Sequence, residues 1–153
     1  MPTTNNTNTE PSVEDFARVT TFTSAPASVV EALITPQAIA AWWGPTAGSA
    51  AAGGRFVVDF DEGRRTTILV AAVEPQRVEW TVVSAPHHSK EWDGTTILFD
   101  LAPAGAGTEL RFRHRRLTPQ LGCYERCKAG WMHFLDSLVD YVETGGGHPY
   151  GRD

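Results

Sequence analysis

The chain has 153 residues, a formal net charge of −5 at pH 7 and 41% hydrophobic residues. This length suits one domain that buries a core of its own. The negative net charge without a basic cluster excludes an electrostatic footprint for nucleic acid or anionic lipid, and no apolar run is long enough to cross a bilayer.

The chain opens with polar residues, and a strand follows. Residues 1–13 lack the positively charged start and the apolar stretch of a secretory signal peptide, so we expect a disordered leader on a cytoplasmic protein. β-Branched and aromatic residues at 14–23 predict the first strand. Ser24 or Ser28 is then expected to cap a short helix, which Pro36 separates from a second short helix.

The second short helix ends on two adjacent tryptophans, Trp42 and Trp43. Neighbouring side chains on a helix diverge by about 100°, so we expect one tryptophan to point into the core. The other, which we assign as Trp43, is expected at a half-exposed rim between the short helices and the last helix of the chain. The small residues at 46–54 predict an exposed loop.

Alternating apolar and polar residues predict about five further strands from residue 54 onward. In three of them the side chains expected on one inward face are Phe56, Val58 and Phe60, then Val78, Trp80 and Val82, then Leu110, Phe112 and His114. Residues 64–74 are apolar on both faces, so their register stays open. Pro103 to Gly107 predict the turn of the last hairpin.

A helical period covers roughly Pro119 to Glu143, with apolar residues at three- and four-residue steps. Cys123 and Cys127 belong to this stripe. Two cysteines are too few for a disulfide scaffold, so we expect reduced, buried thiols. An antiparallel sheet with one apolar face must bury that face against this helix, which predicts an α+β fold whose sheet and helix often enclose an aromatic cavity.

Five motifs occur in order along the chain: "WWGP" at 42–45, "GGRFVVDF" at 53–60, "VEPQRVEWT" at 73–81, "GTELRFRHRRL" at 107–117 and "GWMHFLDSLVDYVETGGG" at 130–147. Together they resemble the START-like or Bet v 1-like (SRPBCC) helix-grip superfamily, within it the stand-alone bacterial group related to the activator of Hsp90 ATPase. Arg115 and Arg116 depart from that pattern, because relatives often carry an uncharged residue and a glycine there.

The resemblance covers residues 14–147 and implies one helix-grip domain, followed by a tail at 148–153. In that fold a curved antiparallel sheet of about six strands wraps around a long C-terminal helix, with two short helices after the first strand. It also implies an internal hydrophobic cavity of the kind that relatives use for lipids, polyketides or other apolar ligands. It implies no reaction, because fold and function separate readily in such superfamilies.

The candidate ligand-binding residues are the inward aromatic side chains and one histidine. His114 is expected to point inward, where it could hydrogen-bond an oxygen of a ligand or act as an acid or base. The candidate walls and rim are Trp43, Phe56, Phe60, Trp80, Phe112, Trp131 and Phe134. The sequence leaves open a filled core instead, in which His114 is hydrogen-bonded to the protein.

No metal site, cofactor or catalytic nucleophile is predicted. His87 and His88 are adjacent in a polar loop, so their side chains point apart, and His133 faces away from the cysteine stripe. The sequence contains no glycine-rich nucleotide motif and no G-x-S-x-G elbow, and Cys127 is expected to be a core residue.

Three functions remain consistent with the sequence. The leading one is a small cytoplasmic domain that binds an apolar or aromatic small molecule under the C-terminal helix. The second is an enzyme of the cyclase or hydratase type, with His114 assisting proton transfer. The third is an interaction module for a chaperone ATPase, which ranks last because 15 polar residues leave no room for the N-terminal domain of the eukaryotic co-chaperone. Unpaired edge strands leave a homodimer open.

Overall fold

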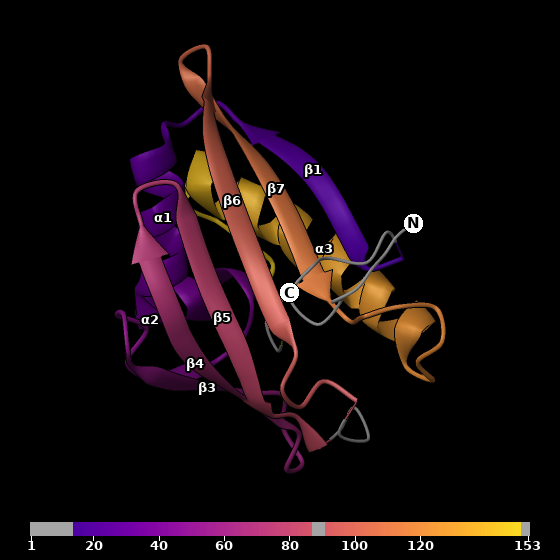
Figure 1. Ribbon diagram of the computed structural model, residues 1–153. Helices are drawn as coiled ribbons and strands as arrows, with labels where there is room; N and C mark the ends of the chain where they lie inside the picture. Colours follow the sequence, from indigo (N-terminus) through magenta and orange to yellow (C-terminus); the bar gives the residue numbers. More distant parts are fainter. Residues whose placement is uncertain (1–13, 87–90, 151–153) are drawn as a thin grey trace.

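The structure is a computed structural model that describes residues 14–86 and 91–150. The expected leader, His87 and His88, and the last three residues lie outside this part. In chain order the elements are β1 (Phe16–Phe22), α1 (Pro26–Ile34), α2 (Pro36–Trp42), β2 (Thr46–Gly48), β3 (Arg55–Asp59), β4 (Arg65–Glu74), β5 (Arg77–Ser84), β6 (Thr96–Ala104), β7 (Gly107–Arg115) and α3 (Tyr124–Thr144), as Figure 1 shows.

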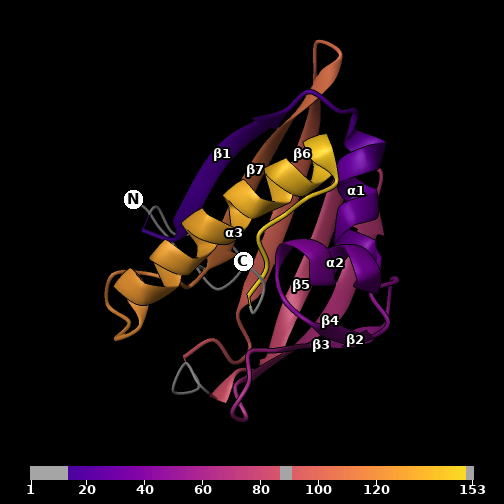
Figure 2. The same cartoon turned by 180° about the vertical axis from the view of Figure 1, so that it is seen from behind.

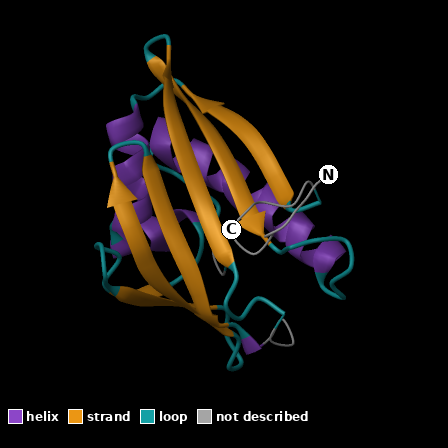
Figure 3. Ribbon diagram, in the orientation of Figure 1, coloured by secondary structure: helices purple, strands orange, loops and turns teal. Residues whose placement is uncertain are grey.

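The strands form one antiparallel sheet of seven strands in the order β1-β7-β6-β5-β4-β3-β2. The helices α1, α2 and α3 lie on the same face of this sheet, and α3 crosses it diagonally (Figures 2 and 3). The helix-grip α+β prediction is therefore confirmed. None of the helices in the described ranges is long and apolar enough to span a membrane.

The seventh strand lies where the sequence predicted a loop. Thr46–Gly48 pairs with Val58 to Phe56 of β3 and forms one edge of the sheet. Its small residues carry no periodic pattern, because an edge strand of three residues is defined by its hydrogen-bonding partner and not by its own side chains.

Three boundaries differ from the sequence prediction. The N-cap of α1 is Ala25, because Pro26 occupies the first helical position. The β6–β7 hairpin turns within two residues, since Gly105 adopts a φ of 60° that allows a tight turn. The long helix begins at Tyr124 and not at Pro119.

The late start of α3 has a tertiary cause. The Glu91 carboxylate accepts hydrogen bonds from the backbone N–H groups of Gly122 (3.1 Å) and Cys123 (3.0 Å). These bonds lower the pKa of Glu91 and supply partners for donors just before the helix. A residue far away in sequence therefore decides where the helix starts.

The register of β4, left open by the sequence, depends on a bulge. Thr66, Ile68 and Val70 point inward, and the pairing with β5 then shifts between Val70 and Ala72. Beyond this shift Val73 lies opposite Val78. One extra residue thus reverses the parity of the strand, which explains why both faces look apolar in the sequence.

Arg116 adopts a φ of 72°, in the left-handed region that favours glycine. Its backbone N–H donates to Asp15 Oδ1 (2.9 Å), and its guanidinium donates to the Gly94 carbonyl (2.6 Å). The family resemblance places a glycine here, and these two hydrogen bonds offset the strain that arginine introduces.

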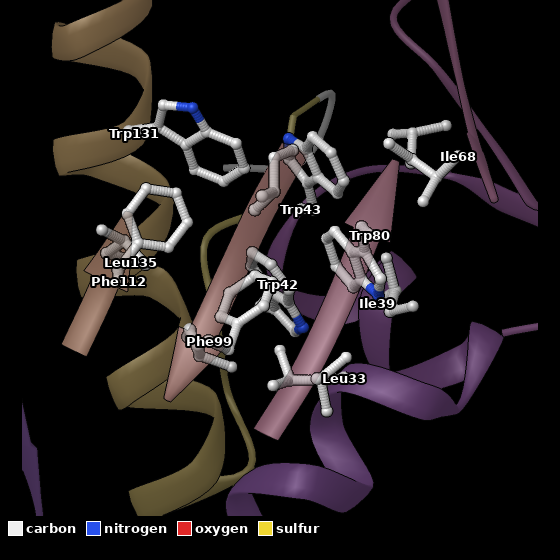
Figure 4. Packing of buried hydrophobic residues seen from close by; sticks show 14 of the residues in the cluster. Leu33, Ile39, Trp42, Trp43, Ile68, Trp80, Phe99, Phe112, Trp131 and Leu135 are labelled. Carbon is white, nitrogen blue, oxygen red and sulfur yellow. The ribbon is translucent and has the colours of Figure 1, made fainter. Parts of the chain in front are cut away.

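Both tryptophans of the "WWGP" motif are buried. Trp42 and Trp43 stack with ring centroids 5.8 Å apart, and Trp43 also stacks on Trp80 at 5.6 Å. Figure 4 shows Trp43 between Trp131 and Trp80. The half-exposed position predicted for Trp43 is wrong, since 2% of the residue is accessible. The reason is tertiary: Phe60 and Trp131 also contact this ring, at 6.1 Å and 5.3 Å between centroids.

Apolar packing attaches α3 to the sheet. Trp131, Leu135 and Leu138 are buried along one face of the helix. Arg18 of β1 adds an ion pair to Asp136 (2.6 Å), but that carboxylate is largely solvated, so the pair contributes little. The helix therefore stays in place chiefly through burial of its apolar stripe.

Replacing Leu135 by alanine should lower the free energy of unfolding by about 2–5 kcal/mol, because it leaves a cavity under α3. Met132, which is 39% exposed on the same helix, provides the control. Met132→Ala should change the free energy of unfolding by no more than about 0.5 kcal/mol. Urea denaturation of both variants measures the difference. Equal losses would contradict the assigned face of the helix.

Candidate ligand-binding site

A pocket of about 280 Å³ opens between α3, the start of β4 and the C-terminal end of the described chain. Six aromatic side chains line it: Trp43, Phe60, Trp92, Trp131, Phe134 and Tyr150. The other lining residues are Arg64, Thr66, Arg126, Cys127 and Gly130. The volume lies near the lower end of the range for small-molecule sites.

The aromatic rings form a continuous wall. Tyr150 contacts Phe60 edge to face (5.4 Å between centroids), and Phe60 contacts Trp43 in the same way (6.1 Å). Trp43 lies 5.3 Å from Trp131, which stacks on Trp92 at 5.9 Å. The wall thus joins α2, α3, two loops and the C-terminal segment, Gly145–Tyr150.

The C-terminal segment reaches the pocket because it folds back along α3 (Figure 2). At Gly147 a Cβ atom would lie 2.5 Å from the Ala41 carbonyl oxygen, so only glycine allows this close approach. Tyr150 then donates its backbone N–H to Trp43 and accepts a hydrogen bond on its hydroxyl from Arg64 Nη2 (3.1 Å). The sequence predicted a tail from residue 148, and Tyr150 of this tail lines the pocket.

Thr66 places a hydroxyl in this apolar wall. The residue is fully buried, and its Oγ1 has no hydrogen-bond partner in residues 14–86 and 91–150. Buried polar side-chain atoms in proteins are hydrogen-bonded in the large majority of cases. A polar atom of a ligand in the pocket would supply the partner that Thr66 lacks.

Among the described residues that line the pocket, two arginines are the only charged ones. Arg64 lies at the β3–β4 turn, where its Nη2 also donates to the Phe60 carbonyl (3.0 Å). Arg126 lies one helical turn before Gly130 on α3 and is exposed. The pocket therefore combines apolar walls with positive charge.

His114 points inward from β7, as predicted, but it does not line the pocket. Trp131 Nε1 donates to His114 Nδ1 (3.0 Å), and His114 Nε2 lies 2.8 Å from Thr95 Oγ1. Since Nδ1 accepts, a neutral ring carries its proton on Nε2 and donates it to Thr95, whose hydroxyl in turn donates to the Trp92 carbonyl (2.6 Å). Nδ1 thus holds the pocket side chain of Trp131 from behind, and Nε2 connects through Thr95 to the backbone of Trp92.

Half of the residues predicted as ligand-binding line this pocket: Trp43, Phe60, Trp131 and Phe134. The other half, Phe56, Trp80, Phe112 and His114, lie in the buried core. Strand parity identified inward residues correctly, but it does not distinguish a core position from a cavity wall.

Seven lining residues were not predicted: Arg64, Thr66, Trp92, Arg126, Cys127, Gly130 and Tyr150. Gly130 carried a usable signal, because a glycine in the middle of a long amphipathic helix weakens that helix unless space is needed. Trp92 and Tyr150 follow no periodic pattern, so nothing local connects them to the site.

The two cysteines are free and buried, as the sequence predicted. Trp92 Nε1 donates to Cys127 Sγ (3.2 Å), and burial, followed by a hydrogen bond with Cys123, raises the pKa of the Cys127 thiol to about 12. Burial also raises the pKa of Cys123. Both thiols therefore stay protonated near neutral pH, a state that is poorly nucleophilic. In the described ranges no three histidine, cysteine or acidic side chains converge as metal ligands would.

A family model described as "Activator of Hsp90 ATPase homolog 1-like protein" matches residues 24–143. The chain belongs to this family. The solution structure of the Aha1 dimer from Colwellia psychrerythraea is similar over 87% of this chain and 98% of its own, with 26% identity and a TM-score of 0.74. A crystal structure of a protein from Mesorhizobium loti is also 26% identical, over 83% of this chain and 96% of its own, with a TM-score of 0.69.

The fold is shared more widely. DynU16, a putative protein in the dynemicin biosynthetic locus, matches 88% of this chain with 24% identity and a TM-score of 0.69. The match covers 49% of DynU16, and at this identity it shows the fold alone. A search of curated proteins finds no match.

Cys127 and Cys123 should react very slowly with a disulfide reagent in the folded protein near pH 8. Their raised pKa keeps the fraction of thiolate small, and the side chains are shielded from the reagent. A thiol assay with Ellman's reagent measures the rate, and the same protein in guanidinium chloride should react at both thiols. Fast reaction of the folded protein would contradict the burial of the pair.

Replacing His114 by alanine should lower the free energy of unfolding. It leaves the Trp131 indole N–H without an acceptor in the core, which costs about 1–3 kcal/mol in addition to the cavity created. His133, on the outer side of α3, serves as the control, and His133→Ala should cost much less. Urea denaturation compares the two, and equal stability of the two variants would contradict the structural role of His114.

Proposed function

We propose that the protein binds an aromatic or otherwise apolar small molecule in the pocket beside α3. The main support for this proposal is the Thr66 hydroxyl, which has no hydrogen-bond partner in the described ranges and lies inside a wall of six aromatic side chains. Such a site favours a ligand with one polar atom on an apolar body, because apolar walls supply affinity and few polar groups fix orientation. At about 280 Å³ the pocket suits one compact ring system better than a long acyl chain.

The geometry favours binding over turnover. The residue that the enzyme hypothesis depends on, His114, lies outside the pocket and uses both ring nitrogens for contacts to Trp131 and Thr95. Cys127, which does line the pocket, has a pKa of about 12 and is a poor nucleophile at neutral pH. A general acid or base must reach the reacting atom through a hydrogen bond or one water, and His114 is not placed for that.

Self-association stays a prediction. The Colwellia psychrerythraea relative is described as a dimer. In this chain β1 and β2 are the edges of the sheet, and an exposed edge offers backbone groups for pairing with a second copy.

Replacing Gly130 by leucine tests the proposed site. Gly130 lines the pocket, and a Cβ atom there meets no atom within 4 Å, so the added side chain starts in open space and occupies part of the pocket. Binding of naphthamide, a neutral two-ring probe, can be followed through the indole N–H NMR signals of Trp43, Trp92 and Trp131. We expect these signals to shift in the original protein and the affinity to fall about tenfold or more in Gly130→Leu.

The neighbouring residue gives a matched control. Ala129 is exposed on the same helix, so Ala129→Leu introduces the same side chain outside the pocket and should leave the affinity unchanged. Equal affinity of Gly130→Leu and the original protein would refute the pocket as the binding site.

A further inference from the structure

We infer that the ligand is an aromatic carboxylic acid, whose carboxylate binds Arg64 and Arg126 at the pocket mouth and accepts a hydrogen bond from Thr66. This inference rests on the proposed function and goes further, because it names the chemical class of the ligand. Three observations carry it: the position of the two guanidinium groups, their lack of ion-pair partners, and the orphaned hydroxyl.

The three polar groups converge from two walls. Arg64 and Thr66 are two residues apart at the start of β4, and both line the pocket, so their side chains leave the chain on the same side. Arg126 comes from the first turn of α3, and Gly130 follows it on the same helical face. Between these walls the ring system of a ligand would contact Trp43 and Trp131, with its substituent at the mouth.

The charge at the mouth is not neutralised. The chain carries a net charge of −5, yet both charged residues that line the pocket are arginines. Within residues 14–86 and 91–150, neither Arg64 nor Arg126 forms an ion pair. The acidic group that interacts electrostatically with Arg126 is Glu91, whose carboxylate already accepts the backbone N–H groups before α3.

The donor set matches a carboxylate. Arg64 uses Nη2 for the Phe60 carbonyl and the Tyr150 hydroxyl, which fixes the plane of its guanidinium at the pocket. Its Nη1 has no hydrogen-bond partner in the described ranges, and neither does any guanidinium nitrogen of Arg126. Guanidinium groups bind the two oxygens of a carboxylate through parallel N–H bonds, and a buried hydroxyl adds a third donor. A neutral ligand would leave both cations without a counter-charge.

The test compares two ligands of nearly identical shape. Naphthoate carries a carboxylate, and naphthamide carries a neutral amide at the same ring position. Their affinities are measured by NMR titration for the original protein, for Arg126→Gln and for Lys128→Gln. Arg126 is exposed and forms no hydrogen bond or ion pair in the described ranges, so Arg126→Gln should fold normally. Lys128→Gln is the control, because it removes the same charge from an exposed residue of α3 that does not line the pocket.

We expect naphthoate to bind the original protein about fivefold to tenfold more tightly than naphthamide, the range for charge-assisted bonds at a partly solvated mouth. Arg126→Gln should remove most of this difference by weakening naphthoate alone, and Lys128→Gln should preserve it. A third variant, Thr66→Val, should weaken naphthoate without lowering stability, because in the free protein its hydroxyl makes no bond that is lost.

Equal affinity for the two ligands in the original protein, or a loss in Lys128→Gln as large as in Arg126→Gln, would overturn the carboxylate inference. Either result would leave the proposed function intact as long as naphthamide binds and Gly130→Leu prevents it. If neither ligand shifts the indole signals, both the proposed function and this inference fail.

Discussion

The position of Trp131 connects the long helix, the sheet and the pocket. Its ring lies 4.6 Å from Phe112 of β7 and 5.3 Å from Trp43 at the end of α2, and its N–H bonds to His114. An indole that buries this much area and also satisfies its donor contributes more than any exposed ion pair on α3. Because Trp131 belongs to the core on one side and to the pocket on the other, displacing α3 would disrupt both.

The pocket exists because the packing of α3 is interrupted beside that anchor. Gly130 has no side chain, although the next residue is the bulky Trp131. No atom lies within 4 Å of the position that a Cβ atom of residue 130 would take. The C-terminal segment then closes one side with Tyr150, held by Trp43 and Arg64. A cavity bounded by rigid stacked rings is largely pre-formed, which reduces the ordering cost of binding a ligand.

Membership in the Activator of Hsp90 ATPase homolog 1-like family accounts for the architecture and leaves the chemistry open. The residues that give this pocket its character, Arg64, Thr66 and Arg126, lie at its mouth and in one wall and not in the hydrophobic core. Core residues define where the helix and sheet meet. In the proposed function, the few polar groups at the open end would orient the bound ligand.

The periodicity of the sequence correctly predicted the inward faces of β3, β5 and β7, the α+β class and the buried stripe of α3. These features depend on side chains that are close together in the chain. Periodicity failed where distant segments meet. Glu91 binds the backbone just before α3, a bulge reverses the parity of β4, and the rings of Trp80 and Trp131 enclose Trp43. The pocket is assembled from a turn, a loop, a helix and the C-terminal segment. Which side chains enclose an empty volume, and which merely fill the core, is a property of three-dimensional packing that no local pattern encodes.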